Sequence, residues 1–187
     1  IWLQKKLDGL EIPSDERTRT AAGCFDTVLE HQVAIFILLE NQLYGSAFAL
    51  ARSVFEGYVR GIWLHKCATD SQVTQFLKGK LDRTFQELID DIEKLDGYAV
   101  GVISNAKKAG WTILNGFTHT GSVQVLSRNS DDFIESNYPE SDIVAIAGFV
   151  NAVALLAGVE VACLSKSESE KLAEEFLDKM KEYAGNA

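Results

Sequence analysis

Proline is scarce in this sequence: the 187 residues contain two, Pro13 and Pro139. Because proline interrupts a helix by removing a backbone donor and clashing with the preceding turn, the long stretches around these two positions can form unbroken helices. Strict alternation of apolar and polar residues, which marks a half-buried strand, is missing as well. These two absences argue against a sheet and predict an all-α fold.

Cysteine and histidine are also rare, with three of each. Cys24, Cys67 and Cys163 lie far apart and form no Cys-x-x-Cys pair, which argues against a disulfide framework or a zinc site. The Glu-x-x-His motif of di-iron bundles, Gly-rich phosphate loops and dinucleotide fingerprints are all missing. We therefore predict free thiols in a reducing, cytoplasmic compartment, and neither a metal nor a cofactor.

Basic residues are in the minority, since 18 Lys and Arg face 27 Asp and Glu for a formal net charge of -9. This balance favours solubility and argues against a broad phosphate-binding surface, although it leaves room for a small basic pocket. Hydrophobic residues make up 47% and charged residues 24%, as in folded proteins. We predict one domain over residues 1–187, in which residues 1–19 form an N-terminal arm or a short helix.

Hydrophobic periodicity predicts a single-domain helical bundle. Two long helices are expected over residues 20–43 and 47–65, and Tyr44-Gly45-Ser46 between them is typical of a tight turn, so the two helices should run antiparallel. Four shorter peripheral helices are predicted. Two are expected over residues 84–95 and 104–119. Of the other two, one begins at Asp70, which caps it, and the last begins at a capping box formed by Ser167-Glu168-Ser169-Glu170.

The stretch 143–164 is apolar except for Asn151 and Glu160. It is long enough to span a bilayer, but small residues dominate, a carboxylate lies inside it, and acidic residues precede it. We predict the long apolar central helix of the bundle and no membrane span. Because this helix is apolar on every side, we also predict a homodimer. The polar stretch 127–141 before it is predicted to be a long loop, either mobile or functional.

Arg52, Glu56 and Arg60 recur every fourth residue along the 47–65 helix and form a charged ridge between two apolar faces. Buried charges are tolerated only when they are paired, so the ridge needs partners from other helices. Glu160 and Glu40 are the predicted partners of Arg52 or Arg60. The ridge is either a structural ion-pair ladder or part of a ligand site, and the pattern leaves both interpretations open.

A second group of polar residues, Asn115, Thr118 and His119, closes the 104–119 helix. Histidine titrates near neutrality and can act as an acid, a base or a ligand. At a helix end it also interacts favourably with the last carbonyls, which is the structural alternative. The 47–65 helix and the 104–119 helix each place polar side chains beside an apolar face, and neither helix supplies enough hydrogen-bond or ion-pair partners of its own. We therefore predict that His119 lies near the charged ridge.

Such a site would bind an anionic group. Arg52 and Arg60 would offer paired donors, Glu56 would hold one arginine in place, and His119 would supply a hydrogen bond or a proton. The candidate ligand-binding residues are Arg52, Glu56, Arg60, Asn115, Thr118, His119 and Glu160, and the candidate catalytic residues are Arg60 and His119. We interpret the chain as a module that binds a small anionic ligand or a protein partner.

Two segments, LARSVFEGYVRGIWL (residues 50–64) and LNGFTHTGSVQ (residues 114–124), resemble an uncharacterised family of bacterial all-helical proteins. That resemblance implies a helical bundle and no established activity. A looser similarity is to the HEPN superfamily, whose metal-independent ribonucleases carry an Arg-x4-6-His motif that Arg60 and His65 match in spacing. It implies an alternative function, a dimeric ribonuclease of a toxin or phage-defence system acting on RNA. However, a regular helix would turn the Arg60 and His65 side chains about 140° apart, so the two could not act together within one chain.

Overall fold

A computed structural model describes residues 2–165 and 169–185, and the regular structure in these ranges is helical, with no strand. The helices are α1 (Trp2–Leu7), α2 (Glu16–Glu40), α3 (Tyr44–Lys66), α4 (Asp70–Leu77), α5 (Phe85–Ile92), α6 (Val102–Thr118), α7 (Ser122–Leu126), α8 (Glu140–Leu164) and α9 (Ser169–Gly185). The prediction of an all-α bundle is confirmed. All three cysteines are free thiols.

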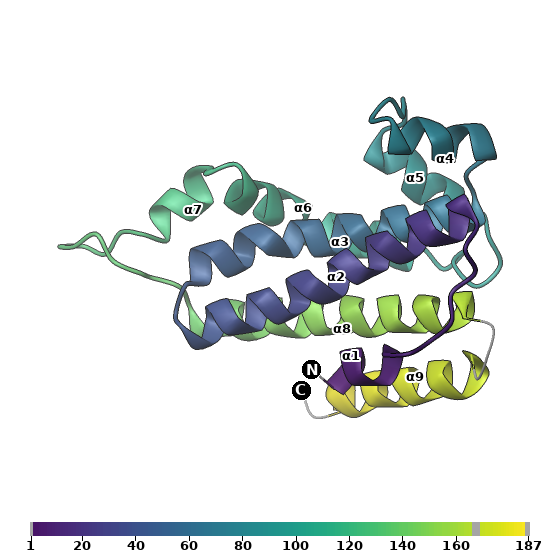
Figure 1. The fold of residues 1–187 in the computed structure, drawn as a ribbon. Helices are drawn as coiled ribbons and strands as arrows, with labels where there is room; N and C mark the ends of the chain where they lie inside the picture. The colour runs from purple at the N-terminus through teal and green to yellow at the C-terminus, as the bar shows by residue number, and fades with distance from the viewer. Residues whose placement is uncertain (1, 166–168, 186–187) are drawn as a thin grey trace.

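Helices α2 and α3 form the predicted antiparallel pair and pack along their whole length (Figure 1). The predicted turn at Tyr44-Gly45-Ser46 is wrong, because these residues begin α3. The chain instead reverses at residues 41–43, where Gln42 adopts a left-handed φ of 58° and the Leu43 N–H donates to the Leu38 carbonyl at 2.8 Å. Gly45 is therefore not a turn residue.

Side-chain caps set the starts of several helices. Asp15 accepts a hydrogen bond from the Thr18 N–H and starts α2 four residues before the predicted boundary. Thr69, rather than the predicted Asp70, caps α4 through a capping box with Gln72. The capping box predicted at Ser167 and Glu168 lies outside the described residues, and α9 is described from Ser169.

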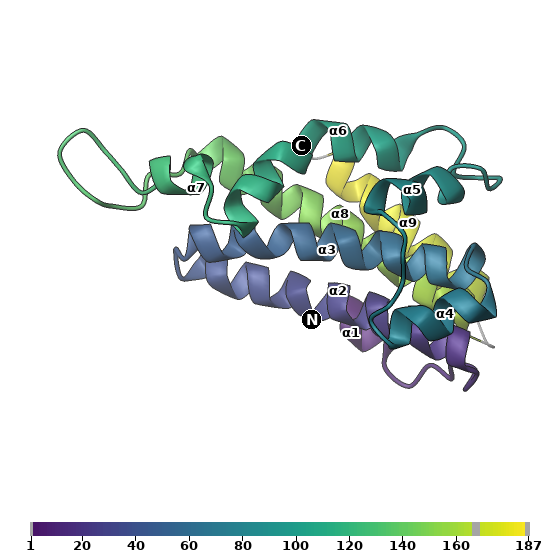
Figure 2. The same cartoon turned by 90° about the horizontal axis from the view of Figure 1, so that it is seen from above.

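Helix α8 is the third long helix and lies against both α2 and α3, while α1 and α9 pack on α8 (Figures 1 and 2). The prediction of a long apolar helix here is confirmed, and it begins at Glu140. Lys6 of α1 pairs with Glu175 of α9 at 2.6 Å, so helices from the two ends of the chain meet. Helices α2 and α8 are long and apolar enough to cross a membrane. Core helices of soluble proteins meet the same two criteria of length and composition.

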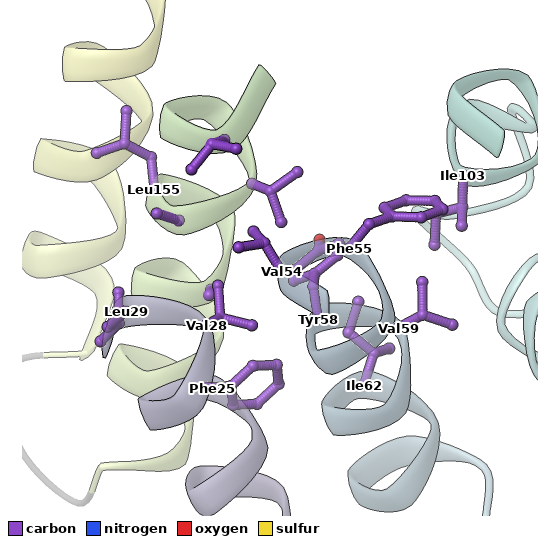
Figure 3. Close-up of a cluster of buried hydrophobic side chains, with 14 of the residues drawn as sticks. Phe25, Val28, Leu29, Val54, Phe55, Tyr58, Val59, Ile62, Ile103 and Leu155 are labelled. Atoms are coloured by element: carbon purple, nitrogen blue, oxygen red, sulfur yellow. The ribbon is translucent and has the colours of Figure 1, made fainter. Parts of the chain in front are cut away.

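The core fills the space between the long helices (Figure 3). Buried side chains from α2, α3, α6 and α8 meet there: Phe25, Val28, Leu29, Val54, Phe55, Tyr58, Val59, Ile62, Ile103 and Leu155. A Cβ on Gly61 would lie 2.7 Å from Phe25 Cζ, so the bare glycine backbone makes room for this ring. Burial of such side chains, each worth roughly 1.5–3 kcal/mol, is the main stabilising contribution.

Helices α5 and α6 pack against α3 on the side away from α2, and this arrangement frames the candidate site (Figure 2). Helix α7, which was not predicted, follows α6. Residues 127–137, called the arm below, then project from the body of the bundle (Figures 1 and 2). The chain returns to the body at Tyr138, whose ring packs against Phe48 and Phe117 before α8 begins. The stretch predicted as a mobile or functional loop is thus a hydrogen-bonded hairpin-like projection, with an isolated antiparallel bridge between Asn129 and Ile134.

Candidate functional site

The charged ridge is held together within α3. Arg52 Nε donates to Glu56 Oε1 at 2.7 Å, and Arg60 Nη1 donates to Glu56 Oε2 at 2.6 Å. Both oxygens of one carboxylate are therefore occupied, and the Glu56 side chain is only 15% exposed. The ridge is partly buried, as expected from its place between two apolar faces, but its carboxylate comes from the same helix as its two cations.

Glu160 does not contact the ridge, so its predicted pairing with Arg52 or Arg60 is wrong. It is 5% exposed, accepts a hydrogen bond from the Tyr98 hydroxyl, and lies 3.1 Å from Lys66 Nζ as an ion pair. Burial, and then the neighbouring Glu160 carboxylate, raises the pKa of Tyr98. Because α8 runs parallel to α3, a residue near the end of α8 lies level with the end of α3 (Figure 1).

Glu40, the other predicted partner, is exposed near the end of α2 and likewise does not contact the ridge. Helical periodicity identified the face on which each acid lies. Periodicity does not give the position of each acid along the axis of α3, so it could not show whether the acid would lie level with Arg52 or Arg60.

His119 lies against the ridge, which confirms the predicted proximity of the two segments. It is the C-cap of α6, with its N–H bonded to the Asn115 carbonyl at 3.1 Å, and its Nε2 is 2.7 Å from Arg52 Nη1. Arginine stays protonated and can only donate. In this contact Nε2 is therefore the acceptor. His119 thus acts as a cap and as a partner of the ridge at once.

Thr118 and Asn115 do not orient His119 through their side chains. The Thr118 hydroxyl donates to the Leu114 carbonyl at 2.9 Å and lies 3.3 Å from the Ala49 carbonyl, which ties α6 to α3. The Asn115 Oδ1 atom is buried without a hydrogen-bond partner. Of the two, Thr118 stabilises the junction of helices on which the His119 contact depends.

Two aromatic rings complete the site, and sequence reasoning missed both as site residues. Phe85 of α5 stacks on Trp111 of α6 with centroids 4.8 Å apart and an interplanar angle of 11°. The Arg52 guanidinium lies 4.7 Å from the Trp111 centroid, and the Arg60 guanidinium lies 6.0 Å from the Phe85 centroid. Lys107 Nζ lies 5.3 Å from Trp111 and 5.7 Å from Phe85. Such distances are typical of cation–π contacts.

We call this assembly the cationic cluster: Arg52, Glu56, Arg60, Phe85, Lys107, Trp111 and His119. Arg52 and Arg60 share the Glu56 carboxylate, and the Lys107 Nζ donates to Gln86 Oε1 at 2.6 Å. The cluster therefore holds three cations and one carboxylate, so its local charge is positive on a chain whose formal net charge is -9. Lys107 and Trp111 are four residues apart on α6, and that spacing was the available sequence signal. The partner ring, Phe85, comes from α5, and nothing in the sequence ties it to α6.

The Arg60–His65 pair of the HEPN comparison is not assembled within the chain. Helix α3 is unbroken from Tyr44 to Lys66, so the two side chains have the separation of a regular helix. His65 Nδ1 is buried without a partner, and burial, followed by the nearby Lys66 charge, lowers the pKa of His65. Arg60 instead faces Glu56.

Surface cavities of about 350, 420 and 300 Å³ are lined by residues outside the cationic cluster. The cluster is instead a partly open face, with the Arg60 side chain 39% exposed. Within residues 2–165 and 169–185, His, Cys, Asp and Glu side chains form no group of three or more that could hold a metal ion.

A search of curated proteins and a search of solved structures each found no match. A family model described as a family of unknown function, DUF6988, matches residues 25–185. The matched range includes every residue of the cationic cluster, and it agrees with the resemblance to an uncharacterised family. Because the match covers most of the chain, this protein belongs to the DUF6988 family of unknown function.

Proposed function

We propose that this protein is a binding module that recognises an anionic group, a carboxylate or a phosphate, at the cationic cluster. The observation that carries the proposal is the excess of positive charge on an otherwise acidic protein. Arg52 and Arg60 share one carboxylate, Glu56, and Lys107 lies over the adjoining Phe85–Trp111 stack. Cations gathered in this way repel one another unless an anion lies among them. A second anion, from a ligand or a protein partner, would balance the cluster.

The arginines have donors to spare for such an anion. Arg52 uses Nε and Nη1 in its contacts with Glu56 and His119, which leaves Nη2. Arg60 uses Nη1 for Glu56, which leaves Nε and Nη2 as an adjacent pair. An adjacent pair of guanidinium donors matches the two oxygens of a carboxylate or phosphate. Glu56 and the aromatic rings hold the arginines in place, so little side-chain entropy is lost on binding.

The same contacts favour binding over catalysis. A general base needs a free nitrogen lone pair, and the Nε2 lone pair of His119 accepts from Arg52. The open face of the cluster also lacks the enclosure that excludes water from most reaction sites. A ribonuclease would use the same arginines on phosphate, so activity must be measured directly.

Binding is tested by isothermal titration of the protein with inorganic phosphate and, separately, with acetate. We expect Arg60→Gln to weaken the response to at least one anion by about tenfold, because it removes the most exposed donor pair. Arg19→Gln, at an exposed position of α2, is the matched control and should leave binding unchanged. Equal binding by both variants, or no response from wild type, would overturn the proposal.

Turnover is tested by incubating wild type, Arg60→Ala and His119→Ala with total RNA in the absence of metal, after thermal unfolding has verified each fold. We expect no cleavage by any form. Cleavage by wild type that both substitutions abolish would instead assign the cluster to a ribonuclease.

A further inference from the structure

The arm ends in an apolar tip flanked by acids. Phe133 is 68% exposed and Ile134 is 80% exposed, although both are bulky hydrophobic residues. Asp131, Asp132 and Glu135 beside them are exposed as well. Exposed apolar patches surrounded by polar residues are interaction sites more often than other parts of a protein surface are. The tip therefore offers two kinds of recognition, apolar contact and negative charge, within a few residues.

The arm is held in a defined shape. Ser130 N–H donates to the Phe133 carbonyl at 2.9 Å, and Glu135 N–H donates to the Arg128 carbonyl at 2.9 Å. Further towards the body, Asn137 N–H donates to the Ser127 carbonyl at 2.9 Å. These backbone hydrogen bonds fix the position of the tip in the free protein. Binding at the tip therefore costs less conformational entropy than binding by a flexible loop would.

The arm's own bundle does not cover the tip. The arm leaves the body beyond α7 and extends away from α3, α5 and α6, as both views show (Figures 1 and 2). The tip therefore needs a second molecule if it is to be buried. Its partner should present aromatic surface for Phe133 and Ile134 and cations for the acids.

The cationic cluster has these properties. Its Phe85–Trp111 stack is only partly buried, and Arg60 and Lys107 lie over these rings. We infer that the arm of one copy docks on the cationic cluster of a second copy, the Asp131 and Asp132 carboxylates pairing with Arg60 and Lys107. This inference rests on the proposed function, because it names the anionic partner. Two-fold symmetry makes the contact reciprocal, each copy giving one arm and receiving the other.

The pairing also explains how an acidic chain could self-associate. Two copies with a formal charge of -9 each repel at long range. Only a local meeting of opposite charges, backed by apolar burial, offsets this repulsion at the interface. Because the charges are partly exposed, added salt weakens the charge pairing at the interface, while it also screens the long-range repulsion between the two copies.

A charge-swap experiment tests the inference by sedimentation velocity at micromolar concentrations. One variant carries Asp131→Lys and Asp132→Lys on the arm, and the other carries Arg60→Glu and Lys107→Glu on the cluster. Each variant alone opposes like charges and should dimerise at least about tenfold more weakly than wild type. Mixed together, the two variants restore opposite charges at both contacts, so the mixture should recover the dimer.

Asp8→Lys with Glu11→Lys is the matched control, since it makes the same charge change at exposed positions away from the arm. It should leave dimerisation no weaker than in wild type. Lys107→Glu alone is a second cluster variant that leaves the Arg60–Glu56 pair intact. Circular dichroism verifies the fold of every variant.

A monomeric wild type, or a mixture that stays monomeric, would overturn arm docking. The titration with phosphate and acetate separates this failure from that of the proposed function. Anion binding that depends on Arg60 in a monomeric protein would leave the proposed function standing and remove the inferred partner. Loss of both responses would remove both proposals.

Discussion

At the scale of single residues, Glu56 organises the candidate site. Its two oxygens hold Arg52 and Arg60, and through Arg52 it reaches His119 on another helix. A single carboxylate thus fixes the position of two guanidinium groups that would otherwise repel one another. Stability and recognition depend on the same side chain here.

We predict that Glu56→Gln destabilises the fold by about 1–3 kcal/mol, because hydrogen bonds to a charged, mostly buried group are lost and two cations are left facing each other. Urea unfolding measures this change. Glu30→Gln, at an exposed position of α2, is the control and should stay within about 0.5 kcal/mol of wild type. Equal stability of the two variants would show that the ridge contributes nothing to folding.

His65 gives the fold a pH dependence of known sign. Burial lowers its pKa in the folded state below the ordinary 6.5, so the unfolded chain binds the proton more readily. Stability should therefore be complete above about pH 6.5 and fall as the pH drops through that value. The Asp15 and Glu87 carboxyls, whose pKa values lie below their usual range, act at more acidic pH.

We predict that His65→Gln flattens the decline in stability between about pH 7 and pH 5. Urea midpoints of wild type and variant across this interval measure the effect. An unchanged slope in the variant would place the titrating group elsewhere.

At the scale of helices, close approach of α2 and α3 depends on glycine. An alanine Cβ at position 61 would lie 2.7 Å and 2.8 Å from Phe25 Cζ and Cδ1, whereas one at position 23 would meet nothing within 4 Å. We predict that Gly61→Ala destabilises the fold by about 1–3 kcal/mol through overpacking. Gly23→Ala, its matched control within the same helix pair, should be neutral or stabilising by up to about 1 kcal/mol. Thermal unfolding of both variants checks the contrast, and a stabilising Gly61→Ala would contradict it.

The junction of α3 with α8 depends on the pair of Lys66 and Glu160. Removal of the lysine leaves a carboxylate that is 5% exposed with the Tyr98 hydroxyl as its remaining described hydrogen-bond donor. We predict that Lys66→Met costs about 1–3 kcal/mol, because only the Glu160 end of the pair is buried, and that Lys66→Met combined with Glu160→Gln costs less than the single change. Urea unfolding of the two single variants and the double variant measures the coupling. A double variant less stable than Lys66→Met would refute it.

Much of this element-level picture was predictable from the sequence. Helical periodicity placed α3, α6 and α8, and the unpaired polar groups of two segments predicted that His119 meets the ridge. The axial register of α8 on α3 was not encoded in any local pattern, so the partner of Glu160 was wrongly assigned. Phe85 and the hairpin form of the arm depend on tertiary contacts, and α7 is too short for a periodic pattern to reveal.

At the scale of the whole molecule, charge is distributed unevenly. The formal net charge of -9 describes the average surface, while the cationic cluster has the opposite sign and the arm tip repeats the average sign in concentrated form. Bulk composition argues against a broad basic surface. It could not reveal a local cluster, because its members come from residues 52 to 119 and are brought together only by the fold.

The pairing of α1 with α9 has a consequence for synthesis of the chain. Lys6 and Glu175 are separated by 169 positions, and Leu3 is buried against Gly158 and Phe176, which α8 and α9 supply. Such contacts close loops that span most of the described chain, and their entropic cost is offset only after the intervening helices have condensed. On the ribosome, α1 is made before α9, so α1 stays undocked until α9 has been synthesised.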